Sequence, residues 1–335
     1  MKTLLTQDVG LAADILGRGG LVAFPTETVY GLGADARNPE AVRRIFLAKG
    51  RPADNPLIVH IAHPADITQV AVVTASGADL ARRYWPGPLT LVLPVLPGIP
   101  DIVVAGLSTV AVRCPDHAVA RSLLLAAGCA VAAPSANRSG RPSPTTAAAV
   151  LEDLDGRIDA VLDGGPCRLG VESTVVDCTG ADRRILRLGA LAAEELGLPP
   201  RLAGEGSPRS PGTRYRHYAP AIPLFVVDDL AVGLRSHPEA AVLCSAQEAA
   251  LVGLLPGPSV HLWAQTPIGR AAELFAVLRG FEATRQRSIV VTPLPQTGID
   301  AATMDRLVRA SAGAREDSPA RAGRDAPAPG VGGFC

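Results

Sequence analysis

The stretch PTETVYGLG occupies residues 25–33, AKGRPADNPLIVHI follows at residues 48–61, and APSANRSGRPSP lies further on at residues 133–144. Each stretch borders short apolar runs that predict β-strands. Together they supply hydroxyls, amides and two fixed cations, Lys49 and Arg51, but neither a carboxylate pair nor a set of metal ligands. These groups suit the binding of a polyanion better than hydrolysis by acid–base catalysis.

The step from Lys49 to Arg51 stands out against the composition. The chain has 32 Lys and Arg, and only two of them, Lys2 and Lys49, are lysines. An ammonium is a compact point charge that fits between phosphate oxygens, whereas a guanidinium favours planar, bidentate pairing. The Lys-x-Arg step therefore offers a polyanion one cation of each kind.

Length and composition predict a two-domain globular protein. The chain has 335 residues, 47% of them hydrophobic, and a formal net charge of zero. A sizeable core is therefore expected, and an anion site must be local because no global field attracts nucleic acid or membrane. No apolar run has the length of a membrane span, and the N-terminus lacks the pattern of a secretory signal. The six cysteines lack metal-binding spacing, so we expect reduced thiols and a cytoplasmic location.

Strand and helix patterns alternate over about the first 200 residues. Apolar runs predict strands at 21–24, 57–61, 90–95, 109–114, 130–133, 160–163, 173–178 and 185–188. Helical spacing predicts helices at 8–17, 39–49, 116–127 and 145–154. Asn38, Asp116 and Thr145 are the expected N-caps of the last three. The alternation predicts a twisted, mixed α/β sheet.

The composition changes at residues 204–220 to GEGSPRSPGTRYRHYAP, which is typical of a linker. This stretch also carries Arg209, Arg214, Arg216 and His217, more cationic character than a plain spacer needs. Beyond it, strand patterns at 224–227, 241–244, 259–263 and 288–291 alternate with helical patterns, the clearest at 267–281. This alternation predicts a small Rossmann-like parallel sheet. Because no GxGxxG follows its first strand, we expect no dinucleotide site there.

Five motifs, in order over about residues 1–310, resemble one family. They are PTETVYGLG, Lys49-x-Arg51, Ser135-x-Asn137, GVESTVVD at residues 170–177 and SPGTRYRHYAP at residues 210–220. The family is the threonylcarbamoyl-AMP synthases, in their long form. The resemblance implies a YrdC-like catalytic domain at 1–205, a linker or lid at 206–220 and a small Rossmann-like domain at 221–312. The composition of residues 313–335, rich in Ala, Pro, Gly and Arg, predicts a disordered tail. Thr213 stands where the family usually has Met, a departure expected to affect linker packing.

The resemblance implies a nucleotidyltransferase reaction. L-threonine, bicarbonate or CO₂, and ATP would give threonylcarbamoyl-AMP and pyrophosphate, the first step in making threonylcarbamoyladenosine (t6A) in tRNA. Such chemistry depends on positioning and charge neutralisation rather than on a protein nucleophile. Mg²⁺ would accompany ATP, held largely by the nucleotide and water, and no metal ligands are assigned to the chain. A separate threonylcarbamoyl-transfer machinery would receive the product, without a required tRNA contact here.

The resemblance also implies which residues form the site. The catalytic residues would be Lys49, Arg51, Ser135 and Asn137. The L-threonine pocket would be lined by Thr28, His60, Arg113, Ala133 and Ser173. ATP would be held by Arg51, Asn55, Thr109, Ser135, Ser143, Arg187 and His217. Arg113 has independent support, because it ends a predicted strand and its fork suits an α-carboxylate.

Simpler interpretations exist for single residues and for the whole chain. Taken alone, Lys49 and Arg51 could favour a helix C-terminus, and His60 could be a core histidine. A double-stranded-RNA-binding or translation-associated protein is the main alternative, but the zero net charge and the lack of an RNP or KH motif disfavour it. A carbamoyltransferase is a third interpretation, although the chain lacks room and ligands for a metal-binding catalytic domain.

Overall fold

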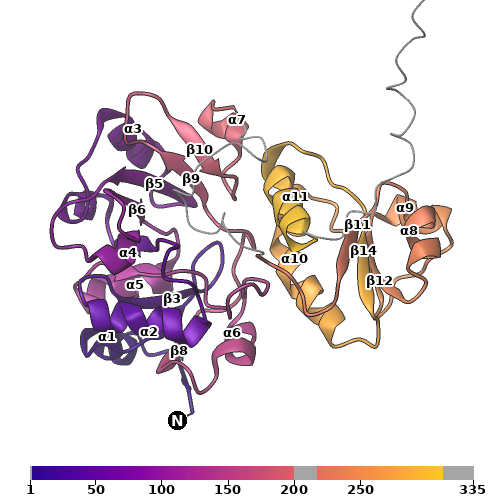
Figure 1. Cartoon of the computed structure of the whole chain (residues 1–335), viewed down its shortest axis with the longest axis horizontal. Helices are drawn as coiled ribbons and strands as arrows, with labels where there is room; N and C mark the ends of the chain where they lie inside the picture. The colour runs from indigo at the N-terminus through magenta and orange to yellow at the C-terminus, as the bar shows by residue number, and fades with distance from the viewer. Residues whose placement is uncertain (1, 200–216, 312–335) are drawn as a thin grey trace, which may run out of the picture.

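The computed structural model describes residues 2–199 and 217–311. Within these ranges the chain forms a large domain and a smaller domain that lie side by side (Figure 1). The larger domain contains a ten-stranded sheet with the order β1-β8-β2-β3-β7-β4-β6-β5-β9-β10. Parallel pairs such as β4 with β6 occur beside antiparallel pairs such as β5 with β6, so the predicted mixed sheet is confirmed.

The strands of the larger domain are short. They are β1 (Leu4–Thr6), β2 (Val22–Phe24), β3 (Gly31–Asp35), β4 (Ile58–His60), β5 (Leu89–Pro94), β6 (Thr109–Arg113), β7 (Val131–Ala132), β8 (Ala160–Leu162), β9 (Thr174–Asp177) and β10 (Arg184–Arg187). The helices are α1 (Val9–Gly17), α2 (Pro39–Lys49), the 3₁₀ helix η1 (Pro64–Gln69), α3 (Ala75–Tyr84), α4 (Asp101–Val104), α5 (Ala118–Ala127), α6 (Ala147–Leu154) and α7 (Ala193–Leu196).

Helix ends follow local signals in some places and not in others. The Asn38 side chain accepts hydrogen bonds from two backbone amides at the start of α2, and Gly50 ends that helix in the left-handed conformation, as the sequence predicts. Two predicted caps are wrong by one residue. His117 rather than Asp116 is the N-cap of α5, and Thr146 rather than Thr145 caps α6 by accepting from an amide of its first turn.

Strand β3 is not predicted from the sequence, because its residues GLGAD lack an apolar run. It pairs antiparallel with β2, so PTETVYGLG is the turn and second strand of a hairpin. A Cβ atom at Gly33 would lie 2.8 Å from Val131 and 2.9 Å from Phe24. Close packing against neighbouring side chains therefore requires glycine here. Because glycine interrupts the apolar run that would predict a strand, the sequence pattern does not reveal β3.

The smaller domain has the predicted Rossmann-like architecture. Its strands β11 (Leu224–Val226), β12 (Ala240–Cys244), β13 (Val260–Leu262) and β14 (Ser288–Val291) form a parallel sheet with the order β11-β14-β12-β13. The helices are α8 (Leu230–Ser236), α9 (Ala246–Leu251), α10 (Pro267–Glu282) and α11 (Gly298–Ala310). Helices α10 and α11 lie on the side that faces the larger domain, and α8 and α9 lie on the far side (Figure 1).

The two domains share a hydrophobic cluster. Val29 and Val171 of the larger domain belong to the same buried cluster as Phe275 of α10. A Cβ atom at Gly170 would lie only 2.3 Å from the carbonyl oxygen of Ala271, so the backbone of α10 packs directly on this loop. Ion pairs such as Arg279 with Asp153, at 2.8 Å, add to the contact. The interface is therefore well packed.

Some predictions fall outside the described residues. They are the conformation of the linker up to Arg216, including Arg209, Thr213 and Arg214, and the disorder of the tail at 313–335. The predicted domain boundaries consequently remain predictions. Over the ranges described, no helix combines the length and the apolar character needed to cross a bilayer.

Candidate active site

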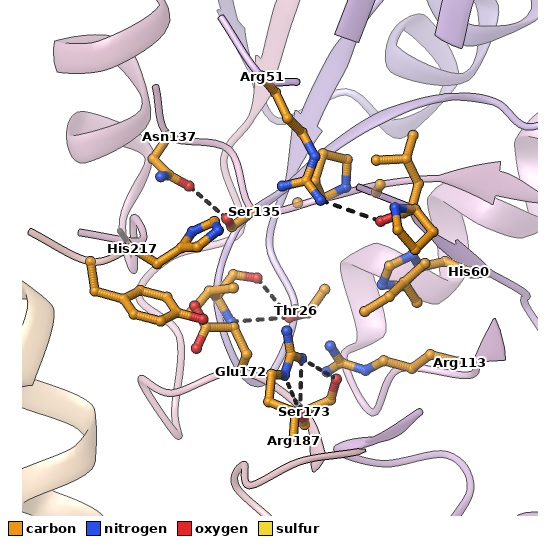
Figure 2. A pocket seen from close by; sticks show the side chains of 18 residues that line it. Thr26, Arg51, His60, Arg113, Ser135, Asn137, Glu172, Ser173, Arg187 and His217 are labelled. Atoms are coloured by element: carbon orange, nitrogen blue, oxygen red, sulfur yellow. Dashed lines mark hydrogen bonds between the residues drawn. The ribbon is translucent and has the colours of Figure 1, made fainter. Parts of the chain in front are cut away.

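A cavity lies where strand ends and loops of the larger domain converge beside the smaller domain (Figure 2). Polar groups reach it from the β2–β3 hairpin, the segment between α2 and β4, the end of β6, the loop after β7, the segment before β9 and the end of β10. Its lining residues are Thr26, Val29, Gly31, Arg51, Pro56, Leu57, Ile58, His60, Arg113, Ala133, Pro134, Ser135, Asn137, Glu172, Ser173, Arg187, His217 and Tyr218.

Three arginines give the cavity a positive character. Arg51, Arg113 and Arg187 all line it, and Arg113 and Arg187 are only 4% and 6% exposed. Burial lowers the pKa of Arg51 to about 10 and also lowers the pKa of Arg187, yet Arg51 still carries its charge at neutral pH. The cavity therefore offers planar donors that suit carboxylate or phosphate groups.

The two histidines in the cavity are neutral at pH 7. Burial, and then the charge of Arg113, lower the pKa of His60 to about 3. Burial, and then the charge of Arg51, lower the pKa of His217 to about 4. A neutral imidazole can both donate and accept a hydrogen bond. The histidines therefore serve as polar ligand contacts rather than as additional cations.

Buried partners hold the arginines in place. A guanidinium nitrogen of Arg113 lies 2.8 Å from Oε1 of Glu27, which is itself 1% exposed. Arg187 donates from Nη2 to the carbonyl oxygen of Ser173 at 2.8 Å, and Ser173 Oγ lies 2.7 Å from Thr90 Oγ1. Such partners restrict the orientation of each fork, so the cavity wall is organised by the protein itself.

Lys49 has a different position from Arg51. Its side chain is buried behind the cavity, and Nζ donates to the carbonyl oxygens of Ser135 and Asn137. Burial, followed by the charge of Arg51, lowers the pKa of Lys49 well below its usual value. Ser135 Oγ also donates to Asn137 Oδ1 at 2.6 Å. Lys49 thus links the end of α2 to the Ser-x-Asn loop.

The structure brings most of the predicted site residues together. The lining includes Arg51, His60, Arg113, Ala133, Ser135, Asn137, Ser173, Arg187 and His217. The predicted residues outside the lining are Thr28, Lys49, Asn55, Thr109 and Ser143.

Hydrogen bonds connect Thr28, Asn55 and Ser143 to residues that line the cavity, whereas Thr109 is the exception. Thr28 Oγ1 lies 2.8 Å from Thr26 Oγ1 in the hairpin, and Ser143 donates to Glu172 at 2.6 Å. The carbonyl oxygen of Asn55 accepts from Arg51 at 3.3 Å. Thr109 begins β6, whereas the cavity residue Arg113 ends it. The roles of all these residues remain predictions.

The sequence reasoning missed several lining residues, chiefly Thr26, Glu172 and Tyr218. Each lies inside a motif already singled out, so its position in the chain was a signal. Their burial was not visible from the sequence: Tyr218 is 4% exposed and stacks on Phe275 of α10 with ring centroids 5.5 Å apart. Contacts of this kind depend on the docking of the smaller domain.

The donor set does not fit a resident metal. No group of three His, Cys, Asp or Glu side chains in the described ranges could hold an ion. Glu172 is the sole carboxylate among the lining residues, and Ser143 and Arg306 already occupy its oxygens. Ser135 Oγ bonds to an amide rather than to a histidine. Within the described residues, these features define an α/β protein with a cavity whose fixed arginines and hydroxyls suit an anionic ligand.

Comparisons with known proteins give the family. A family model described as "Telomere recombination" matches residues 14–189, and one described as "Threonylcarbamoyl-AMP synthase, C-terminal domain" matches residues 183–312. The chain is 42% identical over 318 residues to the threonylcarbamoyl-AMP synthase of Pyrococcus abyssi, covering 90% of this chain and 94% of the relative. It is 41% identical over 329 residues to that of Bacillus subtilis, covering 91% and 93%. The chain belongs to the threonylcarbamoyl-AMP synthase family.

A solved structure agrees with this assignment. The crystal structure of P. abyssi Sua5 complexed with L-threonine matches with a TM-score of 0.83 and 39% identity, over 93% of this chain and 97% of that one. The match extends across both domains, so the long, two-domain form predicted from the five motifs is confirmed.

Proposed function

We propose that this protein condenses L-threonine, bicarbonate or CO₂, and ATP into threonylcarbamoyl-AMP and pyrophosphate, the first step towards t6A in tRNA. The observation that carries the proposal is the convergence of three arginines on one cavity in a chain of this family. One substrate has a carboxylate and the other a triphosphate, and each needs fixed cations. The relative solved with L-threonine supports the assignment of the amino acid.

Arg113 is the proposed partner of the threonine carboxylate. It ends β6, and Glu27 holds it from behind at 2.8 Å, so its remaining donors can face the cavity. Neutral His60, the backbone of Ala133 and the hydroxyl of Ser173 would surround the rest of the amino acid. Thr28 supports this wall through Thr26. The result is an amino-acid subsite with one charged anchor.

Arg51 and Arg187 are the proposed partners of the ATP phosphates, with His217 and Ser135 beside them. The threonine nitrogen forms a bond to the CO₂ carbon and loses a proton, which gives a carbamate. A carbamate oxygen then attacks the α-phosphorus, and the bond to pyrophosphate breaks. Fixed cations stabilise the charge that develops on the phosphates, so the reaction needs orientation and neutralisation rather than a protein nucleophile.

Mg²⁺ would enter with ATP as part of the substrate, because the described residues offer no cage for it. Its charge would offset the phosphate oxygens, and water would complete its coordination. We further propose that the product passes to a separate threonylcarbamoyl-transfer system in the cytoplasm. A carbamoyl-adenylate is an activated species, so rapid transfer to the tRNA adenosine would limit its loss to hydrolysis.

The experiment that tests the function is pyrophosphate release from Mg-ATP, with L-threonine and bicarbonate each supplied or omitted. We expect release only when both are present, together with formation of the threonylcarbamoyl adenylate. Release without threonine would identify a different acceptor. A folded protein that binds ATP but releases no pyrophosphate under any of these conditions would contradict the proposal and favour the RNA-binding alternative.

A further inference from the structure

Glu172 introduces a negative charge into a cavity that should receive a polyphosphate. It lines the cavity and is 6% exposed. Burial alone would raise its pKa, but the charges of Arg306 and Arg187 outweigh this effect and lower the pKa, so Glu172 remains a carboxylate at neutral pH. A buried carboxylate close to the phosphates of ATP would repel them unless another group compensates for it.

The compensating group comes from the smaller domain. Arg306 lies on α11, is fully buried, and donates from Nε to Glu172 Oε2 at 2.9 Å. Ser143 occupies the other carboxylate oxygen at 2.6 Å. Arg306 also donates to Asp305 at 2.8 Å, and its guanidinium carbon lies 5.3 Å from the ring centroid of Tyr218. Arg306 is therefore behind the cavity wall and does not line it.

The same helices position the end of the linker. Tyr218 contacts both helices: its ring stacks on Phe275 of α10, at 5.5 Å between ring centroids, and also contacts the guanidinium of Arg306 on α11. It adopts a left-handed backbone conformation with φ of 66°, which is uncommon for a residue other than glycine. His217 lies against the Tyr218 ring at 5.5 Å. Arg306 consequently contacts both the carboxylate and the aromatic residue that the cavity presents beside His217.

We propose that Arg306 is a positioning residue for ATP. It neutralises Glu172, fixes the orientation of that carboxylate and leaves the cavity with the positive charges of Arg51 and Arg187, whereas Arg113 is already paired with Glu27. This inference rests on the proposed function. It assigns the smaller domain a specific contribution to substrate binding, made through Glu172 and without contact between Arg306 and the ligand.

The test compares Arg306→Met, Glu172→Gln and the double variant by calorimetric titration of the full chain with Mg-ATP. We expect Arg306→Met to weaken binding at least 30-fold, because the buried carboxylate of Glu172 then faces the phosphates without its ion-pair partner and keeps only the hydrogen bond from Ser143 and the more distant charge of Arg187. The double variant should bind within about threefold of the original protein, because both charges are gone. The binding of Mg-ATP by Arg306→Met should also improve as the pH falls and Glu172 takes up a proton, whereas the original protein should show no such gain.

Arg279→Met is the matched control. Arg279 also extends from the smaller domain to a buried carboxylate, Asp153, at 2.8 Å, and it is likewise absent from the cavity lining. Asp153 also pairs with Arg141 at 2.9 Å, so it should retain a cationic partner after the substitution. The control removes a comparable interdomain ion pair, so it should bind Mg-ATP within about threefold of the original protein even if its thermal stability falls.

The outcomes separate the inference from the proposed function. Unchanged Mg-ATP binding in Arg306→Met at pH 7.5, without pH dependence, would overturn the role of Arg306 and leave the synthase function intact. Failure of the original protein to bind Mg-ATP would instead contradict the proposed function. If Arg306→Met does not fold, the Arg306→Lys variant tests the inference in its place. It keeps the charge, so the inference requires binding within about tenfold and no pH dependence, and a larger loss would overturn it.

Discussion

The buried arginines of the two domains lie on different parts of the fold. In the larger domain, Arg113 and Arg187 end the strands β6 and β10, and both line the cavity. In the smaller domain, Arg279 and Arg306 project from the helices α10 and α11, and they contact carboxylates of the larger domain. The larger domain therefore forms most of the site. The smaller domain stabilises the walls of the site, because its arginines pair with buried carboxylates there.

The largest expected effect concerns the larger domain. Arg113→Lys keeps a cation beside Glu27 but loses the planar fork that we assign to the threonine carboxylate. We expect kcat/KM for L-threonine to fall about 100-fold, which corresponds to about 2.7 kcal/mol. Pyrophosphate release at varied threonine concentrations measures the change. Arg168→Lys is the control, because its ion pair with Asp116 is exposed. Equal effects of the two substitutions would contradict the assigned role of Arg113.

Two cations within the larger domain allow a sharper comparison. Lys49→Met leaves the carbonyl oxygens of Ser135 and Asn137 without their donor, so we expect the free energy of unfolding to fall by about 2–3 kcal/mol. Arg51→Met removes a cavity cation and should lower affinity for Mg-ATP with a smaller effect on stability. Urea unfolding and calorimetric titration of both variants measure the two quantities. The comparison fails if Lys49→Met weakens ATP binding while its stability stays unchanged.

The contact between the domains can be disturbed at a residue that does not itself line the cavity. Gly170 has a φ of 73°, and a Cβ atom there would lie 2.3 Å from a backbone oxygen of α10. We expect Gly170→Ala to lower the free energy of unfolding by about 2 kcal/mol, through backbone strain and displacement of α10. A thermal melt measures the loss. Gly180→Ala, where the added Cβ meets nothing within 4 Å, should melt close to the original protein.

The sequence predicts the parts of the fold that local chemistry determines. Asn38 and Gly50 define α2, and the start of α10 follows from Thr266 as its cap and Pro267 in its first turn. Strand β3 escapes prediction because close packing demands glycine at a strand position. Local capping rules also fail at α5, where neither Asp116 nor the actual N-cap His117 caps the helix with its side chain.

The residues of the site also divide into those that a local motif reveals and those that depend on contacts between distant parts of the chain. Arg51, Ser135 and Asn137 lie in motifs that the sequence presents directly, and the cavity contains all three. Glu172 and Arg306 pair although they lie 134 positions apart in the chain. No local sequence pattern singled out α11, the helix that carries Arg306. Such a pair follows from domain docking, because the burial of each charge is stable only when the other is present. Sequence motifs thus indicate which residues meet the ligand, but not which residues hold them.

The remaining effect is the pH dependence of stability, and it stays small at neutral pH. The pKa of His60 falls from 6.5 to about 3 on folding, so below pH 6.5 the unfolded chain binds a proton that the folded chain does not. Stability should therefore decrease as the pH falls from about 6.5 towards 3, with a slope near 1.4 kcal/mol per pH unit for this residue around pH 5. Urea unfolding of the original protein and of His60→Gln between pH 5 and 7.5 should show the smaller slope in the variant. His217, with its pKa lowered to about 4, contributes in the same direction and remains in both proteins. Identical slopes would mean that His60 binds a proton as readily in the folded chain as in the unfolded chain, and the cavity would then gain a fourth cation below about pH 6.5.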